Sequence, residues 1–135
     1  MSDTHINVRD DSSAHEAYCH ALADNLLIRI GDKWTVKVVI ALSQGPMRYN
    51  QIFKLVGGVS QRMLTLTLKN LERDGLVSRT VYPTNPPRVD YALTERGQTL
   101  TVPLHALWTW VLANHAEIEE DRLAFDTRHQ NAEGL

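Results

Sequence analysis

The chain has 135 residues, of which 43% are hydrophobic and 22% charged, and its formal net charge is −2. This composition is typical of one water-soluble domain with a single hydrophobic core. The longest purely apolar run, Val38–Leu42, is too short to cross a membrane, and Met1–Glu16 lacks the basic start and apolar stretch of a secretory signal. The single cysteine, Cys19, excludes an internal disulfide and a multi-cysteine zinc site. We expect a cytoplasmic protein with no membrane partner, metal or cofactor.

The charge is unevenly distributed along the chain. Residues 45–90 carry seven Lys and Arg against three acidic residues, whereas residues 1–31 and 91–135 are both net acidic. A polyanion responds to the local patch, because salt screens charges beyond a Debye length of about 8 Å. The basic middle third favours nucleic acid as a partner, and chance clustering of charges is the alternative.

The N-terminal third predicts two helices. Residues 1–13 have little apolar content and are expected to form a mobile arm. A helix then follows with Ser12 or Ser13 as its N-cap and an apolar residue at every fourth position, at Tyr18, Leu22, Leu26 and Ile30. Asp32 caps a second helix, which is apolar on nearly all sides and therefore belongs in the core. Gly45–Pro46 ends it.

The middle of the chain predicts a helix-turn-helix. A short helix around Tyr49–Leu55 is followed by a tight turn at Val56–Val59. Ser60 then caps a helix that extends to about Asp74. Two helices joined by a short glycine-containing turn are the pattern of this motif.

A β-hairpin and a terminal helix are expected next. Strands are predicted over Leu76–Tyr82 and Arg88–Leu93, and a loop with three prolines separates them. Thr94 caps a final helical region, in which Pro103 either kinks the helix or starts a separate one.

The order of these elements predicts the fold class. It is mainly α with a small β-hairpin wing (α+β), a winged helix-turn-helix. We expect this domain, with terminal dimerisation helices, over residues 14–126. The tail over residues 127–135 is expected to be disordered.

The second helix of the motif has a basic outer face. On a helical wheel, Leu64, Leu68 and Leu71 share the core side, and the cations lie opposite. A capped N-terminus and a basic face suit a helix in the major groove of DNA, and a merely solvated amphipathic helix is the alternative. Leu66 lies among the outer residues, where it either contacts a thymine methyl or is an ordinary exposed leucine.

Candidate DNA contacts follow from this face. Gln61 and Arg62, in the first turn, are best placed for base edges, whereas Lys69 and Arg73 are placed for phosphates. With the two hairpin arginines, the candidate DNA-binding residues are Ser60, Gln61, Arg62, Thr65, Leu66, Lys69, Arg73, Arg79 and Arg88.

The hairpin contributes two of these residues. Arg88 follows the proline-rich tip, where a wing presents a side chain to the minor groove or its rim. Arg79 shares a strand face with Val77 and Val81 by alternation, so it either snorkels from a packed position or contacts DNA.

Short strings over roughly residues 20–112 carry a family resemblance. They are Gly31-Asp32-Lys33-Trp34-Thr35, Gly45-Pro46, Arg48-Tyr49-Asn50, Val59-Ser60-Gln61-Arg62-Met63-Leu64-Thr65, Leu71-Glu72-Arg73-Asp74-Gly75-Leu76-Val77, Arg79-Thr80-Val81-Tyr82-Pro83, Pro86-Pro87-Arg88-Val89-Asp90-Tyr91 and Leu93-Thr94-Glu95-Arg96-Gly97. These strings closely resemble the HxlR-type bacterial transcription regulators, a winged-helix group near the MarR regulators. The resemblance implies a homodimeric repressor or activator on a pseudo-palindromic operator, paired through the first and last helices. Several members sense electrophiles or oxidants by an N-terminal cysteine.

The chain departs from the family pattern at two places. Leu66 and Thr67 stand where the family often has two glutamines, so the family's operator preference does not carry over. The usual cysteine of the family lies a little closer to the Gly-x-Lys-Trp string than Cys19 does. Cys19 is therefore interpreted either as a small packed hydrophobe or as a redox sensor that answers an electrophile or another small-molecule inducer.

The terminal helices predict a dimer. Trp110 lies off the apolar stripe of the last helix, so the apolar surface of this helix is wider than the core of one chain can cover. Pairing of this helix with the first helix of a second copy gives a two-fold homodimer. The candidate dimerisation residues are Tyr18, Leu22, Leu104, Trp108, Trp110 and Val111.

Two functions remain at this point. The first is a sequence-specific transcriptional regulator of double-stranded DNA, a repressor acting as a homodimer. The second is a winged-helix protein-interaction module without DNA binding, because fold alone does not determine function. An enzyme is not expected, because the sequence suggests no catalytic constellation or phosphate-binding loop.

Overall fold

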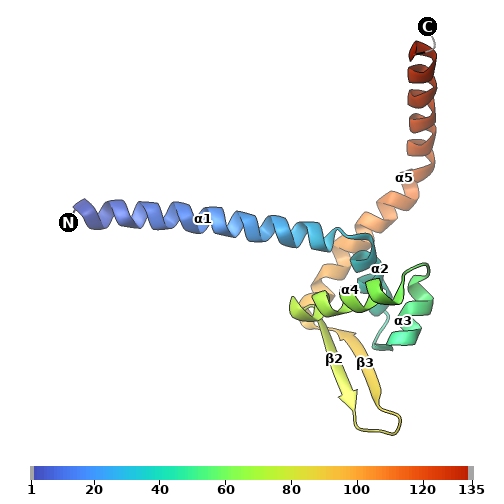
Figure 1. Ribbon diagram of the computed structural model, residues 1–135, viewed down its shortest axis with the longest axis horizontal. Coiled ribbons are helices and arrows are strands. Elements are labelled where there is room, and N and C mark those ends of the chain that lie inside the picture. Colours follow the sequence, from blue (N-terminus) through green and yellow to red (C-terminus); the bar gives the residue numbers. More distant parts are fainter. Residues whose placement is uncertain (1, 134–135) are drawn as a thin grey trace.

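The computed structural model describes the backbone of residues 2–133 and the side chains of residues 12–132. A winged helix-turn-helix occupies the middle of the sequence, and a long helix at each end of the chain extends from it (Figure 1). The elements in chain order are α1 (Ser2–Ile30), α2 (Lys33–Leu42), β1 (Met47–Arg48), α3 (Tyr49–Val56), α4 (Gln61–Arg73), β2 (Val77–Tyr82), β3 (Arg88–Leu93) and α5 (Glu95–Glu133). The predicted fold class is confirmed.

The core is built around α2, as its apolar sequence predicts. Val38 and Val39 are fully buried, and the helices and strands around them contribute leucines, isoleucine and valines. Asp32 caps the helix, because its Oδ2 accepts hydrogen bonds from the backbone N–H groups of Trp34 at 3.1 Å and Thr35 at 3.3 Å. The buried hydrophobic cluster comprises Val36, Val38, Val39, Leu42, Ile52, Val59, Leu64, Leu68, Leu71, Leu76, Val77 and Leu104.

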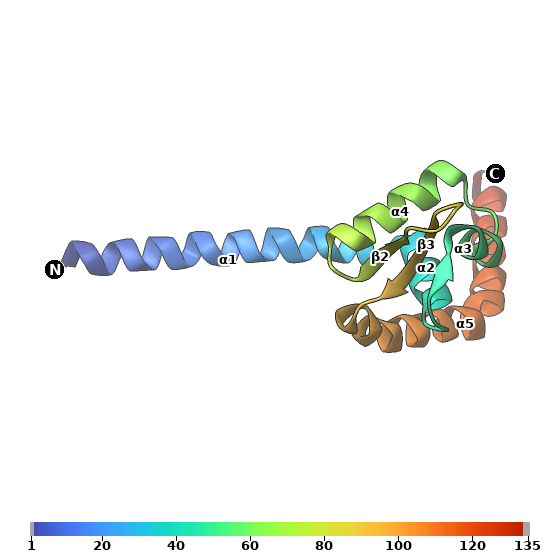
Figure 2. The ribbon, with the colours of Figure 1, turned by 90° about the horizontal axis from the view of Figure 1, so that it is seen from below.

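The helix-turn-helix forms where it is predicted. Gly57 and Gly58 join α3 to α4 with positive φ angles of 66° and 77°, which only glycine adopts without strain. Ser60 caps α4 as expected, because its Oγ accepts a hydrogen bond from the N–H of Met63 at 3.1 Å. Figure 2 shows α4 on one side of the hairpin and the first half of α5 on the other.

The sheet has three antiparallel strands in the order β1-β3-β2. The hairpin was expected, and its two strands pair from Val77↔Leu93 to Tyr82↔Arg88. The third strand, β1, was not predicted, because two residues are too few to show alternation. It pairs with β3 through Met47↔Tyr91 and Arg48↔Asp90.

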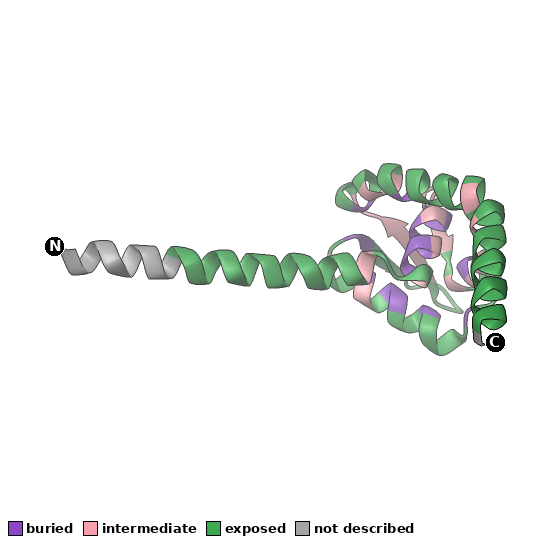
Figure 3. Ribbon diagram, turned by 90° about the horizontal axis from the view of Figure 1, so that it is seen from above, coloured by how far each residue is buried: buried purple, intermediate pink, exposed green. Residues whose placement is uncertain are grey.

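The terminal helices are longer than the sequence indicates. The first begins at Ser2 rather than at a cap on Ser12 or Ser13, and no proline or glycine interrupts residues 2–30. Met1 lies outside the described residues. All of the described α1 side chains before its last turn are exposed (Figure 3).

Pro103 lies inside one continuous helix, so it does not start a separate element. Thr94 caps this helix through a 3.1 Å hydrogen bond from the N–H of Gly97 to its Oγ1. The helix continues past Asp126, where a disordered tail is expected, and residues 134–135 lie outside the described chain. Among residues 2–133, no helix combines the length and apolar content that a membrane crossing requires.

Candidate nucleic-acid interface

Helix α4 is fixed on one side and free on the other. Leu64, Leu68 and Leu71 are at most 2% exposed and hold the helix against the core. The candidate contacts on the opposite side are all exposed, namely Gln61, Arg62, Thr65, Leu66, Lys69 and Arg73. A helix held in this way presents its cations on a rigid element, and Arg62 also lies in the first turn, where backbone N–H groups favour anions.

Tyr49 ties α3 to the first two turns of α4. Its hydroxyl donates a hydrogen bond to the backbone carbonyl of Gln61 at 3.0 Å and lies 3.2 Å from the Oγ1 of Thr65. These contacts fix the orientation of the two helices of the motif. The Thr65 hydroxyl is hydrogen-bonded to Tyr49. Thr65 therefore helps to hold α4 against α3, although it lies on the outer face of α4.

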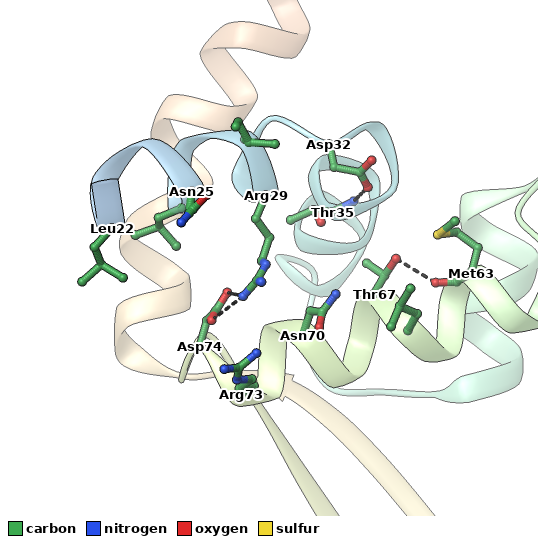
Figure 4. A pocket seen from close by; sticks show the side chains of 13 residues that line it. Leu22, Asn25, Arg29, Asp32, Thr35, Met63, Thr67, Asn70, Arg73 and Asp74 are labelled. Atoms are coloured by element: carbon green, nitrogen blue, oxygen red, sulfur yellow. Dashed lines mark hydrogen bonds and ion pairs between the residues drawn. The ribbon is translucent and has the colours of Figure 1, made fainter. Parts of the chain in front are cut away.

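Leu66 borders a hollow between α4 and α1. This cavity has a volume of about 780 Å³, and Leu66 and Met63 line it from α4 while Leu22 and Leu26 line it from α1 (Figure 4). Leu66 is half exposed. It therefore lies where the outer face of α4 borders a cavity of mixed polar and apolar lining. A helical wheel does not distinguish this position from the centre of the outer face.

An ion pair joins the same two helices. The Nη1 of Arg29, in the last turn of α1, lies 2.9 Å from Oδ1 and 3.0 Å from Oδ2 of Asp74, which follows α4 (Figure 4). The two side chains are 35% and 16% exposed. Because the pair is partly shielded from water, it is held more firmly than an ordinary surface ion pair.

The wing presents its two candidate arginines on opposite faces. Arg88 pairs with Tyr82 across the strands and Arg79 pairs with Tyr91, so their side chains alternate to different sides of the sheet. Arg79 is exposed, although Val77, on its face, is buried. The exposure of Arg79 fits both roles considered for it, because a snorkelling arginine also keeps its charged end in water.

Arg88 is held by a carboxylate. Its Nε donates to Oδ1 of Asp90 at 3.0 Å and its Nη2 donates to Oδ2 at 3.1 Å. The hydrogen bond from Arg88 lowers the pKa of the Asp90 carboxyl, and the positive charges of Arg88 and Arg48 add to this effect. The same hydrogen bond raises the pKa of Arg88.

Sequence reasoning missed Arg48 and Asn50. With Gln51, Arg88 and Asp90 they line a hollow of about 620 Å³ between the start of α3 and the wing. Pairing of β1 with β3 places Arg48 opposite Asp90. No sequence signal reveals this arrangement, because the two-residue strand that creates it is too short to recognise.

The candidate dimerisation residues divide into two groups. Tyr18, Leu22 and Trp110 are more than half exposed, and Trp108 and Val111 are each 37% exposed. Leu104 differs, because it is only 3% exposed and belongs to the chain's own core. Assigning Leu104 to a dimer surface is therefore corrected: its side chain already has intramolecular partners.

Cys19 is exposed on α1 rather than packed within the chain. Its Sγ lies 3.6 Å from the Nε2 of His15, one turn earlier on the same helix. Within the described residues, no group of three His, Cys, Asp or Glu side chains is arranged to hold a metal ion.

Comparison with known proteins relates this architecture to a family. Residues 29–119 match the HxlR-like helix-turn-helix family model. An HTH-type transcriptional regulator of Methanothermobacter thermautotrophicus is 41% identical over 101 residues, which is 75% of this chain and 76% of the relative. The relatives are transcriptional regulators and not enzymes.

Solved structures give the same result. The regulator ytfH from Salmonella typhimurium superposes with a TM-score of 0.70 at 33% identity, over 74% of this chain and 89% of the other. The redox regulator HypR in its oxidized form has a TM-score of 0.64 at 38% identity, over 68% of this chain and 95% of the other. A MarR-family regulator from Porphyromonas gingivalis has a TM-score of 0.63 at 27% identity, over 68% of this chain and 90% of the other. The chain belongs to the HxlR-like helix-turn-helix family of transcriptional regulators.

Proposed function

We propose that this regulator is a homodimeric repressor that binds a pseudo-palindromic DNA operator in the cytoplasm. Helix α4 enters the major groove and the β2–β3 wing contacts the adjacent minor groove or backbone. The observation that carries this proposal is the geometry of α4, whose buried leucines fix the helix while Arg62, Lys69 and Arg73 project outward. A dimer then places two such helices at half-sites about 34–36 Å apart.

The exposed apolar side chains of α1 and α5 support the dimer. Tyr18 and Leu22 on α1 and Trp110 on α5 are each more than half exposed in the single chain. Large apolar residues gathered in this way are typical of protein interfaces. An isologous contact between the terminal helices of two copies buries both sets at once.

Selection of bound sequences from a random DNA pool tests the proposal directly. We expect a two-fold symmetric consensus with half-site centres about one helical turn apart. Affinity for the selected duplex should fall steeply with salt, by about 10³–10⁵ between 50 and 200 mM for 6–10 phosphate contacts. A protein-interaction module without DNA binding would return no enriched sequence and no salt-dependent shift at micromolar protein.

We also propose that Cys19 senses an electrophile or oxidant. Its exposure and its contact with His15 support this assignment, and HypR is a redox regulator by description. Treatment of the dimer with diamide is expected to change operator affinity roughly 5–150-fold, the usual range of coupling between two sites. Cys19→Ser should retain the untreated affinity and lose the response, as measured by fluorescence anisotropy. A response of equal size in Cys19→Ser would reject the sensor role.

A further inference from the structure

Asp90 is an unusual residue for a surface that meets DNA. It lies on β3, the central strand, and its side chain is only 14% exposed although most of the hairpin around it is open. Its negative charge opposes binding to a phosphate backbone by simple Coulomb repulsion. A wing that needed only positive charge would bind DNA better with a neutral residue at this position.

The contacts of Asp90 account for its presence. Both carboxylate oxygens are engaged by Arg88, at 3.0 Å from Nε and 3.1 Å from Nη2. This bidentate geometry fixes the plane of the guanidinium as well as its position. The opposite strand contributes Tyr82, whose ring centroid lies 5.5 Å from the Cζ of Arg88. The guanidinium is thus held at one edge by a carboxylate and on one face by an aromatic ring.

The pairing leaves part of Arg88 free to bind. A guanidinium has five N–H donors, and Asp90 engages one on Nε and one on Nη2. Asp90 does not engage the second N–H of Nη2 or the two N–H groups of Nη1, and the Arg88 side chain is 49% exposed. An arginine held in this way loses less side-chain conformational entropy when it binds a base edge or phosphate, so the binding free energy is more favourable.

Arg48 makes the arrangement more specific. It lies directly opposite Asp90 in the β1–β3 pairing and borders the same hollow as Arg88. Asp90 therefore has cations from two strands near it, Arg88 in an ion pair and Arg48 across the β1–β3 pairing. Their positive charges offset its negative charge and reduce the repulsion that an isolated carboxylate would exert on a nearby phosphate.

We propose that Asp90 is a positioning residue for DNA binding, whose carboxylate orients Arg88 so that its free N–H donors face the duplex. This inference rests on the proposed DNA-binding function. The competing role is masking, in which Asp90 neutralises Arg88 and weakens binding. Positioning and masking predict changes of opposite sign when the carboxylate is removed.

The test compares operator affinities of full-length wild-type and Asp90→Asn protein, on the selected duplex at fixed salt. Asparagine keeps the shape of the side chain but cannot accept both hydrogen bonds or carry the charge. Positioning predicts that affinity falls, on the order of tenfold for a dimer with two wings. Masking, or bulk repulsion alone, predicts that affinity rises. Glu72→Gln, which removes an exposed carboxylate from α4, is the matched control and should leave affinity equal or higher.

A double-mutant cycle isolates the effect that passes through Arg88. In the Arg88→Ala background, Asp90→Asn should no longer weaken binding, because no guanidinium remains to be oriented. An equal loss in both backgrounds would show that Asp90 acts by supporting the sheet, and would overturn the proposal. Thermal unfolding of each variant reports any change in the fold.

Arg88→Lys provides a test that leaves Asp90 unchanged. Lysine keeps the positive charge but cannot form the bidentate pair, and position 88 is exposed, so the fold should tolerate it. If Asp90 positions Arg88, Arg88→Lys should lose about as much operator affinity as Asp90→Asn does. Wild-type affinity of Arg88→Lys would contradict the positioning role. If Arg88→Ala itself has no effect on a protein that binds its operator, then positioning is rejected while DNA binding through α4 stands. If the wild type does not bind DNA, the proposed function fails first.

Discussion

Replacing Arg62 with alanine is expected to weaken operator binding by about 2–6 kcal/mol, because each of the two subunits loses a base or phosphate contact worth about 1–3 kcal/mol. Arg62 lies in the first turn of α4, exposed and next to the Ser60 cap. No other described residue combines a cation with so early a position on this helix. The measurement is a titration of the selected operator by fluorescence anisotropy at fixed salt.

The matched control is Arg122→Ala. Arg122 is an exposed arginine in the second half of α5, which points away from the wing (Figure 1), so its removal changes the net charge equally. It should change affinity by much less than Arg62→Ala. Arg62→Ala should also retain the thermal midpoint of the wild type, because the side chain does not enter the core. Equal effects of the two variants would mean that only overall charge matters, and α4 would lose its assigned role.

Replacing Trp110 with glutamate is expected to separate the two subunits. The side chain is 57% exposed in the single chain, so the charge is tolerated there, but in a dimer interface it would be buried without a partner. Loss of the second half-site should lower operator affinity by about 10²–10⁴, the usual contribution of linking two binding modules. Sedimentation velocity and the operator titration measure the two effects on the same sample.

Two further variants distinguish association from folding. Gln98→Glu adds the same charge to an exposed polar position of α5 and should leave the dimer intact. Leu104→Ala removes a buried core side chain and should lower the free energy of unfolding by about 2–5 kcal/mol. A dimer that persists in Trp110→Glu at micromolar concentration would place the interface elsewhere.

Much of the fold was predictable because residues with known local preferences mark where its helices and strands begin and end. Asp32 and Ser60 precede apolar helical patterns, and both act as N-caps in the structure. The paired glycines of the α3–α4 turn and the prolines at the wing tip mark places where regular structure ends. The predicted start of α1, with Ser12 or Ser13 as its N-cap, was wrong. A serine acts as an N-cap only where a helix begins, and no proline or glycine in the preceding residues prevents the helix from beginning earlier.

The candidate interface was less predictable, because its geometry depends on pairing between distant segments. The wheel identified the outer face of α4, but it does not show that Leu66 borders α1 or that Tyr49 occupies the Thr65 hydroxyl. The roles of Arg48 and Asp90 depend on the register of a two-residue strand. Leu104 shares its apolar stripe with Trp108, which is 37% exposed, and helical spacing does not reveal that, of the two, Leu104 alone is covered by the core.

The Arg29–Asp74 ion pair has a consequence for how two copies would respond to a signal. It connects the last turn of α1 to the residue that follows α4. In a dimer built on α1, a tilt of that helix about the symmetry axis would pull on the far end of α4 through this link. The separation of the two DNA-reading helices would then change with the angle between the subunits, so chemistry far from the duplex could alter the fit to both half-sites at once.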